Sequence, residues 1–443
     1  MPFPFDEAAR IEALRREPAA ARARDSRGQT PLHRAAFLGL AGLARTALEL
    51  GADPDALDHE GRTPLMLTFV QTTMGGISYP GRDEIARLLI ERVNEIDRAG
   101  PDGLTALHLA LGGCYPLPGE ESNPGLELVR ALILRGADPN ARTERGETCL
   151  HLALFLSSPG LLEFLLAHGA EVNAQDGQGE SALFKACLQA PCELLRLLLS
   201  HRANPDLADA RGETPLHRVA DCIRDVEDGL ARAELLLGAG ARPDLPAADG
   251  RTPLHLACRH GSLALVTRLL QAGAGPDRTG PAAPGAQVPL IEALGADQPA
   301  IAELLLAHGA APEARDRDGR PALDLAARWG WLELVRALIG RGAALDATDR
   351  DGGTALHQAA LWGHLEVCRA LLEAGANASA ADRFGQTALL AAAGSRRLEL
   401  AELLLSHGAD PNARRDNGET PLYHAELARD PAMQALLRRH GAR

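Results

Sequence analysis

Residues 29–40 read QTPLHRAAFLGL, and close copies of this stretch recur through the 443-residue chain. Alignment on the position of Thr30 places the first residue of each copy at 30, 63, 105, 148, 181, 214, 252, 288, 321, 354, 387 and 420. Seven of the eleven intervals are 33 residues, and the others are 42, 43, 38 and 36. Twelve units at a period of this size predict a stacked repeat array rather than a set of globular domains.

Each unit carries the signals of two short helices. Thr30 stands where a helix must begin, because its hydroxyl can accept a free backbone N–H, and Pro31 follows at the first helical position. A second helix should end at a glycine in the left-handed conformation. Val93 and Arg202 take that position in repeats 2 and 5, where a different cap geometry is expected. The capping glycines are Gly51, Gly136, Gly169, Gly240, Gly273, Gly309, Gly342, Gly375, Gly408 and Gly441.

The motifs TPLHRAA, TALHLAL, TPLHLAC and TALHQAA, with LLEAGANASAAD between repeats, resemble the ankyrin-repeat family over about residues 28–443. The resemblance implies an all-α fold, an ankyrin-repeat α-solenoid of helix-turn-helix pairs joined by β-hairpin-like turns. It implies an N-terminal capping half-repeat at 1–26, repeats 1–7 at 27–275 with long inserts in repeats 2, 3 and 6, and repeats 8–12 with the C-terminal cap at 276–443. A lengthened turn at 275–287 separates the two blocks, which are expected to be continuous, although two rigid blocks are the alternative.

A histidine recurs at the third residue after the capping position. Twelve catalytic sites in a row would make no chemical sense, whereas repeated structural contacts would, and the resemblance implies that this imidazole bonds across the turns to lock neighbouring repeats together. The densest run of possible metal ligands, His255, Cys258 and His260, places only the first two on one helix face, so we expect neither a metal nor a cofactor. The histidines that recur at the third residue after the capping position are His33, His108, His151, His217, His255 and His357.

The overall composition excludes several classes of partner. A net charge of -13 argues against binding to the phosphate backbone of nucleic acid. No apolar run approaches the roughly 20 residues of a membrane span, and the N-terminus lacks the apolar core of a secretory signal. Seven scattered cysteines suggest no disulfide framework and favour a reducing compartment. We therefore expect a cytoplasmic monomer with a protein or peptide partner, and no nucleic-acid or membrane partner.

Lysine is almost absent. Of the 46 basic residues only Lys185 is a lysine and the other 45 are arginine. A GC-rich genome explains this bias together with the abundance of Ala, Gly, Leu and Pro. The alternative is lysine depletion in a secreted bacterial effector, which would avoid ubiquitin-like modification in a host cell.

Exposed apolar residues at the ends of the first helices are the candidates for partner binding, because aromatic anchors dominate protein interfaces. The alternative is that they only pack on a neighbouring loop. The inserts of repeats 2 and 3 each add a Tyr-Pro pair, and these loops are either functional or inert insertions. The candidate partner-binding residues are Phe37, Leu38, Tyr79, Tyr115, Phe155, Leu156, Trp329, Trp331, Leu361 and Trp362.

These observations predict a non-enzymatic scaffold or adaptor that binds a partner protein on the concave surface of an ankyrin solenoid. No phosphate-binding loop, G-x-S-x-G elbow or H-E-x-x-H motif occurs, and the repeats leave no room for a catalytic domain. Two alternatives stay open. One is a secreted bacterial effector that binds host proteins, and the other is an enzyme or cofactor-binding protein with a site in the inserted loops.

Overall fold

Pairs of short α-helices joined by turns make up the protein. The computed structural model describes residues 6–70, 81–113, 124–221, 226–280 and 287–443. In these ranges the only extended pairing is three isolated antiparallel bridges in the turns. None of the helices there is both long enough and apolar enough to cross a lipid bilayer.

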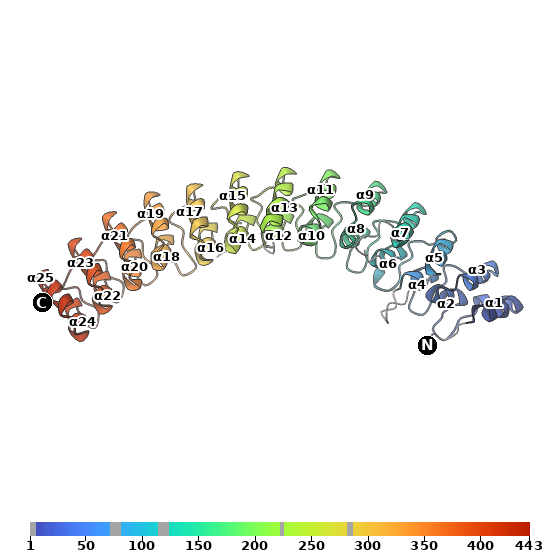
Figure 1. Cartoon of the computed structure of the whole chain (residues 1–443), viewed down its shortest axis with the longest axis horizontal. Helices are drawn as coiled ribbons and strands as arrows, with labels where there is room; N and C mark the ends of the chain where they lie inside the picture. Colours follow the sequence, from blue (N-terminus) through green and yellow to red (C-terminus); the bar gives the residue numbers. More distant parts are fainter. Residues whose placement is uncertain (1–5, 71–80, 114–123, 222–225, 281–286) are drawn as a thin grey trace. The chain divides into compact units, whose positions relative to one another are not determined.

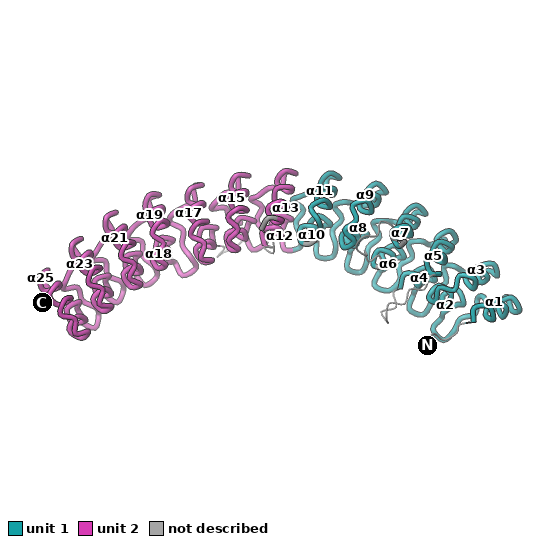
Figure 2. The backbone as a smooth tube through the Cα atoms, viewed as in Figure 1, with its two compact units in different colours: residues 1–210 teal, residues 211–443 magenta. Residues whose placement is uncertain are grey.

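The described chain packs as two compact units, residues 1–210 and 211–443 (Figure 2). The first unit contains α1 (Glu7–Arg16), η1 (Pro18–Arg22), α2 (Pro31–Leu38), α3 (Ala41–Glu49), α4 (Pro64–Phe69), α5 (Arg82–Ile90), η2 (Pro101–Gly103), α6 (Ala106–Gly113), α7 (Pro124–Leu134), α8 (Cys149–Ala153), η3 (Leu154–Leu156), α9 (Pro159–Ala167), α10 (Ala182–Gln189) and α11 (Cys192–Ser200). The second unit contains α12 (Pro215–Asp221), α13 (Val226–Gly238), α14 (Pro253–His260), α15 (Leu263–Gln271), α16 (Pro289–Gly295), α17 (Pro299–Ala307), α18 (Ala322–Trp329), α19 (Leu332–Gly340), α20 (Ala355–Trp362), α21 (Leu365–Glu373), α22 (Ala388–Gly394), α23 (Leu398–Ser406), α24 (Pro421–Leu427) and α25 (Pro431–Arg439).

The boundary between the units follows Ala210, in the turn between repeats 5 and 6. The sequence predicts its joint farther on, at 275–287. The helices on either side of that turn pack against each other within the second unit, α14 against α16 and α15 against α17. A division of the array at 275–287 stays a prediction.

Each unit has two layers of helices (Figure 1). The first helices of successive repeats pack side by side in one layer, as α18, α20 and α22 do, and the second helices α19, α21 and α23 pack in the other. Leu and Ala fill the space between the layers, which suits the close approach of short helices. The exposed side of the first-helix layer is called the first-helix face below.

The helices begin and end where the sequence signals predict. Thr30 Oγ1 accepts a hydrogen bond from His33 N at 3.4 Å, and Gly51 ends the second helix of repeat 1 with φ 82°. Arg202 also adopts the left-handed conformation, with φ 66°, so the prediction of a different cap in repeat 5 is wrong. Val93 is not among the residues with positive φ and is buried, so repeat 2 does end differently.

The turns between repeats are linked by their backbones, as β-hairpin-like turns require. His59 N donates to Arg27 O at 2.9 Å, and the same bond recurs from Gly177 N to Arg145 O at 2.7 Å. Gly146 has φ 74°, and a Cβ there would lie 2.7 Å from Gly177 N, so only glycine permits this approach. The turns thus stack in register with the helices.

Helix α1 and the 3₁₀-helix η1 cover one end of the first unit. The Glu7 carboxylate accepts a hydrogen bond from Leu43 N at 2.9 Å, and Arg22 Nε donates to Gly51 O at 2.9 Å. Leu14 is buried. This segment lies within the capping half-repeat expected at 1–26, and it closes the apolar end that the first repeat would otherwise expose.

Candidate functional site

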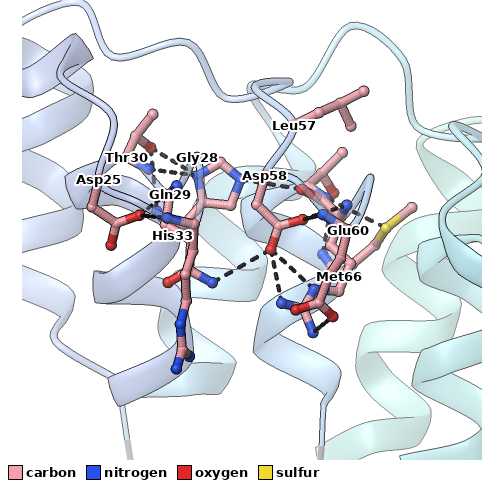
Figure 3. A network of polar contacts seen from close by, with 12 residues as sticks. Asp25, Gly28, Gln29, Thr30, His33, Leu57, Asp58, Glu60 and Met66 are labelled. Carbon is pink, nitrogen blue, oxygen red and sulfur yellow. Dashed lines mark hydrogen bonds and ion pairs between the residues drawn. The ribbon is translucent and has the colours of Figure 1, made fainter.

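The recurring histidine bonds to its own helix cap and to the next repeat. His33 Nδ1 lies 3.1 Å from Thr30 N and 2.9 Å from Thr30 Oγ1, while Nε2 lies 3.1 Å from Arg62 O (Figure 3). A backbone N–H can only donate and a carbonyl can only accept. His33 is therefore a neutral imidazole with its proton on Nε2.

This arrangement recurs wherever the capping threonine and the histidine occur together and a matching carbonyl lies in reach. Burial lowers the pKa of His33, His108 and His151, which keeps these rings neutral. The predicted cross-repeat role is confirmed for five histidines, which use both ring nitrogens in structural bonds. The further Nε2 bonds are His108 to Ala141 O at 3.1 Å, His151 to Glu180 O at 3.0 Å, His217 to Arg251 O at 3.1 Å and His357 to Gln386 O at 2.9 Å.

Repeat 7 departs from the pattern. The Nδ1 atom of His255 meets Thr252 N at 3.0 Å, but Nε2 is buried and makes no hydrogen bond of good geometry within the described ranges. The carbonyl at the matching position belongs to Gln287, directly after the lengthened turn. Burial lowers the pKa of His255 to about 4, so this ring is also neutral. The predicted contact with the next repeat is thus weaker at this turn, where the Gln287 backbone still raises the pKa of His255 against the larger effect of burial.

Repeat 9 departs further, because Asp324 replaces the histidine and Pro321 replaces the threonine. Asp324 is 1% exposed, and neither carboxylate oxygen has a hydrogen-bond partner in the described structure. Proline lacks the N–H that the other repeats use at this point. The Asp side chain is also shorter than His, and the next repeat offers a carbonyl at Gly353, which a carboxylate cannot use as a partner.

The environment of Asp324 disfavours its charge. Burial is the largest cause, and the nearby Asp349 adds to it, so that the pKa of Asp324 is raised to about 7. Arg320 and Arg328 act in the opposite direction but do not reach the carboxylate. A buried acid without a partner thus lies one helical turn before the exposed end of α18.

The exposed ends of α18 and α20 carry an aromatic patch, defined here as Trp329, Trp331, Leu361 and Trp362. Trp329, Leu361 and Trp362 are 57%, 55% and 53% exposed, and Trp331 is partly buried. The rings of Trp329 and Trp331 stack with centroids 6.1 Å apart and an interplanar angle of 19°. Trp329, Trp331 and Trp362 are the three tryptophans of the chain.

Arginine and histidine side chains fix the geometry of the aromatic patch. The Arg328 guanidinium lies 5.6 Å from the centre of the Trp362 ring. His364 Nε2 lies 3.0 Å from Arg328 O, and Arg397 donates to Ala360 O and Leu361 O at 2.7 and 3.0 Å. These contacts tie repeats 9, 10 and 11 together below the exposed rings. The patch is therefore held in place by contacts from three repeats.

The other predicted contact residues lie in the first unit or outside the described ranges. Phe155 is 67% exposed, whereas Leu156 is 8% exposed and faces the interior, contrary to its predicted surface position. Phe37 and Leu38 are partly buried, and Arg82 lies over the Phe37 ring at 5.3 Å. The inserts with Tyr79 and Tyr115 lie outside the described residues.

A surface hollow of about 310 Å³ lies beside Phe155, with His151, Glu180 and Lys185 in its lining. Lys185 Nζ lies 2.7 Å from Asp176 Oδ2 and 3.0 Å from Glu147 Oε1. Although burial opposes it, these carboxylates raise the pKa of Lys185. The one lysine of the chain is thus a cross-link between the turns before repeats 4 and 5 and helix α10.

Sequence reasoning missed the arginines beside the aromatic patch and the orphaned Asp324. The alignment contains a signal for Asp324, since repeat 9 reads RPALDLA where repeat 10 reads GTALHQA. The arginines gave no comparable signal, because the 45 arginines of the chain are spread over its whole length.

Comparison with known proteins identifies the repeats. The model of three consecutive ankyrin repeats matches residues 121–209, 157–227, 191–280, 222–316, 290–382 and 374–443. The model of a single ankyrin repeat matches residues 27–59. Together these matches cover more than half of the chain.

Three curated relatives match parts of the chain. Mouse NF-kappa-B inhibitor delta is 30% identical over 155 residues, which is 32% of this chain and 45% of that protein. The mouse B-cell lymphoma 3 protein homolog is 34% identical over 161 residues, 30% of this chain and 34% of that protein. The intracellular phospholipase A2 of Caenorhabditis elegans is 30% identical over 150 residues, 34% of this chain and 13% of that protein. The match thus spans less than half of each relative. The ankyrin repeats themselves support a role in protein–protein interaction.

Proposed function

Because the chain belongs to the ankyrin-repeat family, we propose that it is a non-enzymatic interaction protein whose aromatic patch binds a partner protein. The surface used is the first-helix face of repeats 9 and 10, part of the concave side expected of such an array. One of the relatives is an NF-kappa-B inhibitor, which supports an adaptor or scaffold role.

The observation that carries the proposal is the exposure of Trp329 and Trp362 at the same position of consecutive repeats. Large apolar side chains at more than half exposure are unfavourable in water unless a partner covers them. Tryptophan is also the residue most enriched in interface hot spots. Two such rings on a rigid scaffold are what a binding anchor requires.

The state of the histidines supports a non-enzymatic role. The buried rings at five repeats are neutral and use both nitrogens in structural bonds, so they offer no free base. The phospholipase match covers 13% of that enzyme, so the shared segment leaves most of the enzyme unmatched. The free buried thiols of Cys149, Cys258 and Cys368 support the proposal of a reducing compartment, the cytoplasm.

The test is affinity capture with the Trp329→Ala/Trp362→Ala variant beside the parent protein. Removing two hot-spot side chains should weaken a dependent complex by about 30-fold or more. Leu134→Ala is the matched control, because Leu134 is 71% exposed but belongs to α7 of the other unit. Unchanged recovery of every partner by the double variant would refute the proposal.

The lysine content favours a second candidate function, a secreted bacterial effector that binds host proteins. The amine of Lys185, the one lysine, forms ion pairs with Asp176 and Glu147, so it is already bound within the protein. The test is translocation of a reporter fusion from a bacterium into host cells. Retention of the reporter in the bacterium would exclude this candidate.

A further inference from the structure

Beyond the aromatic patch, repeats 11 and 12 also carry exposed leucines, one at the start of a second helix and one at the end of a first helix. Leu398 is 38% exposed at the start of α23, and Leu427 is 70% exposed at the end of α24. Leu427 occupies the same repeat position as Leu361. Exposed apolar side chains therefore occur in each of repeats 9–12, although the one in repeat 11 belongs to a second helix, and this spread suits a segment of chain better than a single small molecule.

At the ends of the first helices of repeats 9–11 the exposed charges have one sign, whereas repeat 12 carries Glu426 and Asp430 and the second helix of repeat 11 carries Glu399. In the first helices and following turns of repeats 9–11, residues 322–331, 355–364 and 388–397, the charged residues other than histidine are Arg328, Arg396, Arg397 and the buried Asp324. This surface is positive on a chain whose net charge is -13. The local charge thus differs in sign from that of the whole protein.

The arginines on this surface have no acidic partners. Arg396 contacts Ala428 O, and Arg397 donates to the carbonyls of α20. Across the described ranges no carboxylate forms an ion pair with either of them or with Arg328. In repeats 9 and 10 the glutamates at the start of the second helices are engaged within their own helices, Glu333 with Arg336 at 3.0 Å and Glu366 with Arg369 at 3.4 Å, whereas Glu399 in repeat 11 is exposed.

We propose that the occupant of the aromatic patch is an acidic segment of a partner protein, in which bulky apolar side chains alternate with Asp or Glu. This rests on the proposed function. The apolar side chains would cover Trp329 and Trp362, and the carboxylates would pair with Arg328 and Arg396. Guanidinium groups bind carboxylates through two parallel hydrogen bonds, which selects an acidic segment over a neutral one.

The test uses two synthetic peptides of twelve residues, one of Leu, Phe, Asp and Glu and one in which Asn and Gln replace the acids. Neither peptide contains tryptophan, so the fluorescence of the protein reports on the patch alone, because all three tryptophans lie there. The acidic peptide should bind about tenfold more tightly at about 0.1 M salt, and the difference should vanish at about 1 M.

The Arg328→Gln/Arg396→Gln variant should remove most of the tenfold preference. Arg369→Gln is the matched control, since it removes one arginine from the second helix of repeat 10. Equal binding of both peptides would overturn the acidic segment but leave the proposed function in place. An acidic preference that survives in the double variant would also overturn the proposal of an acidic segment. The same holds if neither peptide binds while a captured partner protein needs both Trp329 and Trp362.

Discussion

Asp324 offers the sharpest test of the physical account, because its burial has a calculable cost. The substitution is Asp324→Asn, which keeps the size of the side chain and removes the ionisable group. Burial raises the pKa of Asp324 from 3.8 to about 7. One pKa unit corresponds to about 1.4 kcal/mol, so the charged form costs the folded protein about 4 kcal/mol at pH 8.

The direction with pH follows from proton binding. Between about pH 4 and pH 7 the folded protein keeps the proton of Asp324 while the unfolded chain has lost it. The stability contributed by this group is therefore fully present below pH 3.8 and is lost as the pH rises through about 7. Relative to the parent protein, Asp324→Asn should be neutral near pH 4 and more stable by about 4 kcal/mol at pH 8.

The assay is urea denaturation of parent and variant at intervals from pH 4.5 to 8.5, with hydrogen exchange of α18 and α20 to localise the effect. Asp416→Asn is the control, since Asp416 is exposed in a turn of the same unit. A difference between Asp324→Asn and the parent that stays constant with pH would refute the reasoning, as would a variant less stable than the parent at pH 8.

Three further predictions concern the scaffold. His151→Ala should lower the free energy of unfolding by about 1–3 kcal/mol, because it leaves Thr148 N without its partner and removes one of the two donors to Glu180 O, and thermal denaturation measures this. Lys185→Met should destabilise repeats 4 and 5, because three carboxylates within 4 Å lose their cation; a urea midpoint equal to that of the parent would contradict this. Gly330→Ala should lower the melting temperature, because φ is 75° and the new Cβ would lie 2.5 Å from His364 Nδ1; the same substitution at Gly160, where nothing lies within 4 Å, is the control.

The repeat scaffold could be predicted from sequence because each of its signals is local. A threonine followed by proline starts a helix whatever lies around it, and a glycine such as Gly51 permits the left-handed cap at any repeat. The histidines could be assigned a role because their spacing from the cap is fixed. The departure at Arg202 was predicted wrongly, since an arginine tolerates φ 66° at a cost of about 1 kcal/mol that tertiary packing can offset.

The candidate site was only partly predictable, because exposure depends on the neighbours of a side chain rather than on its place in the repeat. Phe155 and Leu156 are adjacent in the sequence, yet one is 67% exposed and the other 8%. Both belong to the three-residue 3₁₀-helix η3 (Leu154–Leu156), where successive side chains lie about 120° apart around the helix axis. Likewise, the isolation of Asp324 depends on a missing N–H three residues earlier and a carbonyl 29 residues later, which no single motif reveals.

The central claim is that a partner covers the aromatic patch, and hydrogen exchange of the captured complex tests it most directly. Binding should slow the exchange of backbone amides at 327–331 and 360–364 and leave those beside Phe155 unchanged. Protection confined to the first unit, with the ends of α18 and α20 exchanging as fast as in the free protein, would contradict the account.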